Sequence, residues 1–74
     1  IFIDVGCGKG KVTLMARKSG IIGVEPESYI GIDFEPNLIS IARINSAKMF
    51  GDEGTFLLED VFVFFKFFLL SSNI

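Results

Sequence analysis

The chain contains no histidine and no tryptophan, and its single cysteine is Cys7. One cysteine forms no internal disulfide, and without histidine it has no partners for a structural zinc site. The lack of histidine also removes the usual base that activates a nucleophilic thiol, so we expect no catalytic role for Cys7. These absences favour a reducing compartment, and we expect a cytoplasmic protein without a metal centre.

Charge is also sparse, with 7 basic and 9 acidic residues and a formal net charge of −2. No cationic block is present that could follow a phosphate backbone, so we expect no direct nucleic-acid binding by this segment. The apolar stretch from Val61 to Leu70 is interrupted by Lys66, and its roughly ten residues are about half of what a membrane helix needs. We therefore expect a buried strand there and no membrane span.

Short apolar segments alternate with helical patterns along the chain. Strands are predicted at residues 1–5, 29–33 and 55–59, with a further strand at 61–70, and helices at residues 11–19 and 36–49. The predicted inner faces are formed by Val12, Met15 and Ala16 in the first helix and by Leu38, Ile41, Ala42 and Asn45 in the second. We expect Asn45 to bind backbone rather than ligand. This alternation predicts an α/β fold with a mostly parallel sheet and right-handed crossovers.

The ends of the chain look incomplete. It begins inside the apolar run Ile1–Ile3 without a preceding turn, and the phenylalanine-rich residues 61–74 lack the turn signals of a continuing domain. We expect residues 1–74 to be part of one domain, truncated at both ends, in which only the first β-α-β-α-β part of a three-layer sandwich is present. By itself such a piece should neither fold cooperatively nor show activity.

Two near copies compete for the second strand. Ile22-Gly23-Val24-Glu25 and Ile30-Gly31-Ile32-Asp33 each end in an acid. Pro36 and a helical pattern follow Asp33 at once, as the start of a crossover helix requires, whereas Glu25 precedes Pro26 in a loop-like stretch. The second strand is therefore predicted to end at Asp33, with Glu25 as the alternative.

The glycine turn after the first strand has the form G-x-G-x-G, from Gly6 to Gly10. A phosphate-binding P-loop needs a longer spacing and a hydroxyl where Val12 stands, so that interpretation fails. A dinucleotide fingerprint needs G-x-G-x-x-G, and an acid such as Asp4 beside the loop opposes a pyrophosphate. The same acid favours a ligand with sulfonium and ammonium charges, while Lys9 and Lys11 are expected to point off the loop.

Residues 2–10 resemble motif I of the class I S-adenosylmethionine-dependent methyltransferases. Residues 30–38, followed by Ala42-Arg43, resemble the second strand and helix start of that family, and residues 58–61 resemble the end of its third strand. The resemblance implies a Rossmann-like enzyme that transfers a methyl group from S-adenosyl-L-methionine. The cofactor-binding residues that it implies are Asp4, Gly6, Cys7, Gly8, Gly10, Asp33, Phe34, Asp60 and Val61.

The resemblance also implies roles for single residues. Asp33 would accept hydrogen bonds from both ribose hydroxyls, Asp60 would accept one from the adenine amino group, and the Val61 backbone N–H would meet the adenine ring. Residues for catalysis and for the methyl acceptor usually follow the fourth strand in this family, so no catalytic residue is named.

Several alternatives remain at this point. An NAD(P)-dependent oxidoreductase fragment would use a related architecture, and a short piece could also lack enzymatic function. The acceptor could be a small molecule, an RNA or a protein. The turn at residues 8–11 and the strand at 29–33 also resemble those of RNA guanine-N7 methyltransferases.

Overall fold

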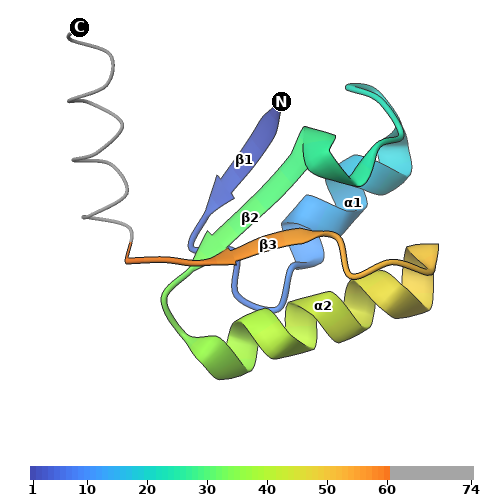
Figure 1. The fold of residues 1–74 in the computed structure, drawn as a ribbon. Coiled ribbons are helices and arrows are strands. Elements are labelled where there is room, and N and C mark those ends of the chain that lie inside the picture. Colours follow the sequence, from blue (N-terminus) through green and yellow to red (C-terminus); the bar gives the residue numbers. More distant parts are fainter. Residues whose placement is uncertain (61–74) are drawn as a thin grey trace, which may run out of the picture.

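A computed structural model describes residues 1–60, which form a three-stranded parallel sheet with two helices packed on it (Figure 1). The elements in chain order are β1 (Phe2–Val5), α1 (Lys11–Ser19), the short 3₁₀ helix η1 (Pro26–Ser28), β2 (Tyr29–Asp33), α2 (Pro36–Phe50) and β3 (Thr55–Leu58). The strand order is β1-β2-β3, and β2 pairs in parallel with both neighbours. The predicted α/β class, the alternation of elements and the parallel sheet are confirmed; the further strand predicted at 61–70 lies outside the described residues.

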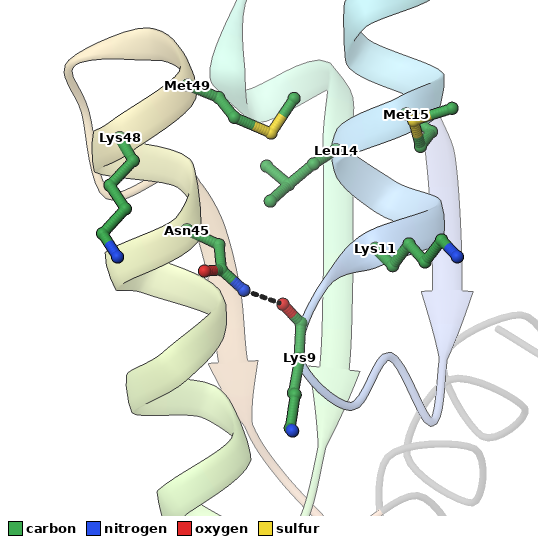
Figure 2. A pocket seen from close by; sticks show the side chains of 7 residues that line it. All are labelled: Lys9, Lys11, Leu14, Met15, Asn45, Lys48 and Met49. Carbon is green, nitrogen blue, oxygen red and sulfur yellow. Dashed lines mark hydrogen bonds between the residues drawn. The ribbon is translucent and has the colours of Figure 1, made fainter.

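Both helices lie over the same face of the sheet, which Figure 2 shows from the helix side. A right-handed crossover that advances in one direction along a sheet places successive helices on one face. The described part therefore supplies the sheet and one helical layer of a Rossmann-like sandwich. The core between them contains Cys7, Leu14, Ile39, Ala42 and Phe56, all of which are buried.

The predicted inner faces of the helices are largely wrong. In α1 the buried residues are Thr13, Leu14 and Arg17, whereas Val12 and Met15 are 59% and 58% exposed. Thr13 and Arg17 turn inward because they bind the carboxylates of Asp4 and Asp52 there. The spacing of apolar residues along a helix contains no information about such polar partners. In α2 the buried residues are Ile39, Ala42 and Ser46, so Ala42 alone among the four predicted inner residues is fully buried.

An ion pair joins α1 to the turn after α2. Arg17 Nη1 and Nη2 donate to Asp52 Oδ1 and Oδ2 at 2.8 and 2.6 Å, and the Arg17 guanidinium lies 4.1 Å from the centre of the Phe50 ring. Asp52 Oδ1 also accepts from the Gly54 amide at 2.8 Å. This carboxylate thus fixes the turn that leads from α2 into β3.

Candidate functional site

The carboxyl ends of the three strands meet at one edge of the sheet (Figure 1). β1 runs into the glycine loop of residues 6–10, β2 ends at Asp33, and β3 ends at Leu58, two residues before Asp60. In open parallel sheets this edge is where ligands bind. The structure therefore brings the predicted segments to one edge, while Val61 lies outside the described residues.

The glycine loop is anchored to the end of β2 by backbone hydrogen bonds. The amides of Gly6 and Cys7 both donate to the Ile32 carbonyl, at 2.7 and 2.9 Å. The Gly8 amide donates to Asp33 Oδ2 at 2.9 Å, and the Gly10 amide closes the turn on the Cys7 carbonyl at 3.0 Å. These bonds fix the loop in place against β2.

Gly8 and Gly10 are required in this loop for different reasons. Both have positive φ angles, +56° and +85°, which side chains rarely adopt. A Cβ on Gly8 would meet nothing within 4 Å, as would one on Gly6, so the outer side of the loop is open to a close-approaching group. A Cβ on Gly10 would lie 2.9 Å from the Phe56 ring and 3.1 Å from Ala42 Cβ. Gly10 therefore permits close packing of the loop on the core, and Gly6 and Gly8 leave backbone exposed.

Asp33 lies at the centre of this edge and is only 7% exposed. Its Oδ2 accepts from the Gly8 amide, and its Oδ1 accepts from the Glu35 amide at 3.0 Å. A carboxylate has about four lone-pair sites, so these two bonds leave acceptor capacity on both oxygens. The prediction that the second strand ends at Asp33 is confirmed, since Glu25 precedes η1 in a loop and is exposed.

Asp4 is held by a residue that the sequence analysis missed. Thr13, which is 1% exposed, donates its hydroxyl hydrogen to Asp4 Oδ2 at 3.0 Å. The bond links β1 to the first turn of α1, and it orients a carboxylate beside the glycine loop. The sequence signal for this contact was a threonine in the first turn of the helix that follows the glycine loop.

Cys7 is a protonated packing residue. Burial, followed by the negative charges of Asp33 and Asp4, raises the pKa of its thiol from 9.0 to about 11. At neutral pH the thiol therefore stays protonated, which makes it a poor nucleophile. The two carboxylates that raise this pKa lie on either side of the loop, and they make its surroundings favourable to cations and unfavourable to anions.

The two lysines of the loop region have exposed side chains, in agreement with the expectation that they point off the loop. Lys9 and Lys11 are exposed and line a hollow between α1 and α2 (Figure 2). Asn45 Nδ2 donates to the Lys9 carbonyl at 3.1 Å, which confirms that Asn45 binds backbone. Phe34, directly after β2, is 72% exposed at the carboxyl edge.

Two further properties concern residues 1–60 only. They contain no group of three or more His, Cys, Asp or Glu side chains placed to hold a metal ion. Neither of their helices has the length and apolar content to cross a membrane.

Comparisons with known proteins agree with this geometry. A family model described as a methyltransferase domain matches residues 1–69. The ribosomal protein L11 methyltransferase of Burkholderia vietnamiensis is 38% identical over 50 residues, which are 68% of this chain and 15% of that protein. The chain thus spans a small fraction of the length of this relative. No solved structure matches the chain significantly.

Proposed function

The chain belongs to the class I methyltransferase family, and we propose that it binds S-adenosylmethionine at the carboxyl edge of its sheet to serve methyl transfer. The observation that carries this proposal is the open backbone of Gly6 and Gly8 with Asp4 and Asp33 on either side. S-adenosylmethionine has a sulfonium and an ammonium group, which two carboxylates stabilise. A dinucleotide would instead bring an anionic pyrophosphate to the same place.

Asp33 is the proposed ribose-binding residue. The amides of Gly8 and Glu35 hold its carboxylate in position, and the remaining lone pairs suit two vicinal hydroxyl donors. Since these amides fix the carboxylate before the ligand arrives, little conformational entropy is lost on binding.

Apolar and polar groups around Asp33 suit an adenine ring. Leu58 pairs with Asp33 in the sheet register, and Leu58 and Phe34 are 49% and 72% exposed. We assign them to the apolar contact with the adenine, Asp60 to its amino group and the Val61 backbone to the ring edge.

When bound, S-adenosylmethionine supplies an electrophilic methyl group on its sulfonium. The contribution of the described residues is to bind and orient the cofactor, and methyl transfer depends mainly on such positioning of the two reactants. None of them is assigned a catalytic role.

Isothermal titration of the full-length protein tests the cofactor. We expect binding of S-adenosylmethionine and S-adenosylhomocysteine, and no comparable binding of NAD. Asp4→Asn should weaken binding, whereas Glu53→Gln, an exposed acid in the turn after α2, should not. Tighter binding of NAD than of S-adenosylmethionine would refute the assignment.

The acceptor is a separate proposal. The relative described above is named for ribosomal protein L11, so a protein is the acceptor class that we propose to test first. The full-length protein would be incubated with methyl-labelled S-adenosylmethionine and separate protein, RNA and small-molecule fractions. Label in the protein fraction supports the proposal, and label in the RNA or small-molecule fraction alone contradicts it.

A further inference from the structure

A hollow of about 430 Å³ lies between α1 and α2, on the outer side of the helical layer (Figure 2). Its apolar lining consists of Leu14 and Met15 from α1 and Met49 from α2. Met15 and Met49 are 58% and 46% exposed, so each of the two helices contributes an exposed apolar side chain. This groove, defined by its lining residues, therefore presents apolar surface to solvent between two helices.

Charge around the groove has one sign. Three lysines line it, namely Lys9, Lys11 and Lys48, and no acidic residue does. The whole chain has only 7 basic residues and a net charge of −2, so the groove is locally cationic in a chain that is acidic overall. All three lysines are exposed, and within residues 1–60 none of them forms an ion pair. The groove thus combines an apolar floor with a cationic rim.

We propose that this groove binds an acidic amphipathic helix of a partner protein. Lys11 belongs to α1 and Lys48 to α2, on opposite sides of the groove, and Lys9 belongs to the glycine loop at one end of it (Figure 2). A helix lying along the groove would place its apolar stripe on the exposed side chains of Met15 and Met49 and its flanking carboxylates within reach of the lysines. Unbranched methionine side chains adapt to the shape of such a stripe.

The length of the groove sets the length of its occupant. The α2 lining runs from Asn45 to Met49, and the α1 lining runs from Lys11 to Met15. Each span covers slightly more than one helical turn, so a partner helix of about two to three turns is sufficient.

Other partner classes fit the lining less well. A single-stranded nucleic acid is usually held by aromatic or arginine stacking in addition to basic charge, and the lining contains neither residue type. A membrane surface is bound by a protruding apolar face, whereas these apolar residues line a concavity between helices.

The test is fluorescence anisotropy with a labelled 14-residue peptide that carries leucines at positions i, i+3, i+4 and i+7 and glutamates on both flanks. We expect saturable binding to the full-length protein that weakens with salt. The double variant Lys11→Glu/Lys48→Glu should lower the affinity by about tenfold, because two ion pairs become like-charge contacts. Lys18→Glu makes one such charge reversal in α1 outside the groove, half the charge change of the double variant, and should change affinity less than twofold.

Thermal melts followed by circular dichroism establish that the variants are folded, and Lys11→Gln/Lys48→Gln should give an intermediate loss of affinity. A peptide with lysines in place of glutamates should not bind. Absence of saturable binding overturns the proposal, as does equal binding to wild type and the double variant. Groove-dependent binding of phosphatidylglycerol vesicles or of an oligothymidine, without binding of the acidic peptide, would also overturn it.

Discussion

The Gly8 amide donates a hydrogen bond of 2.9 Å to the carboxylate of Asp33, a residue 25 positions later in the chain. The bond joins the loop after β1 to the end of β2, and it holds the acid at the edge where the strands end. A second amide, that of Glu35, binds the other carboxylate oxygen at 3.0 Å. The proposed ribose acceptor is therefore in position in the free protein.

Replacing Asp33 by alanine should weaken S-adenosylmethionine binding by about ten- to hundredfold, the usual cost of losing a charged hydrogen-bond acceptor. Glu25→Ala is the matched control, since Glu25 ends the competing copy of the strand but lies in an exposed loop. Titration calorimetry on both variants measures the difference. A larger effect of Glu25→Ala would show that the ribose acid has been misassigned.

Alanine at Gly10 should destabilise the fold more than alanine at Gly8. Both substitutions strain a positive φ, at about 1–2 kcal/mol each. Only the Gly10 side chain would also press on the Phe56 ring, 2.9 Å away, which adds about 1–3 kcal/mol of overpacking. Urea unfolding of the two variants measures the free energies of unfolding.

For Gly8→Ala we expect a loss of cofactor affinity that exceeds its modest loss of stability, because the new methyl group enters the open side of the loop.

The Arg17–Asp52 pair should make stability depend on acid pH. The hydrogen bonds from Arg17 lower the pKa of Asp52 from 3.8 to about 2. A carboxyl group whose pKa is lowered in the folded protein contributes its full stability above pH 3.8, and this contribution falls as the pH drops through about 2. Asp52→Asn should remove this part of the pH dependence and cost about 1–2 kcal/mol at pH 7, since solvent screens a half-exposed carboxylate. Glu53→Gln is the neighbouring control, and equal acid sensitivity of wild type and Asp52→Asn would contradict the role of the pair.

Cys7 should resist alkylation in the folded protein. With a pKa of about 11 in place of 9.0, its thiolate fraction at neutral pH is about a hundredfold smaller than in the unfolded chain. Iodoacetamide labelling followed by mass spectrometry, with and without urea, measures the two rates. The folded-state rate should rise steeply above pH 9, and rapid labelling at pH 7 would show that the thiol is exposed or activated.

The sequence alone was sufficient to predict the two α-helices and the three strands of residues 1–60. The glycine turn, Pro36 and Gly51 mark element boundaries by backbone chemistry that acts within a few residues, so β2 and α2 lie within one residue of their predicted bounds. The order of elements then determined that the glycine loop and Asp33 would share one edge of a parallel sheet.

Tertiary structure decided which side chains face inward and what they bind. The inward turn of Thr13 and Arg17 depends on Asp4 and on Asp52, which is 35 positions from Arg17, and no local periodicity contains such a partner. The same holds for the separate roles of Gly8 and Gly10, because the approach of Phe56 to Gly10 arises only when β3 packs beside β2. Local propensities depend on neighbours along the chain, whereas burial and polar pairing depend on residues that only the folded chain brings into contact.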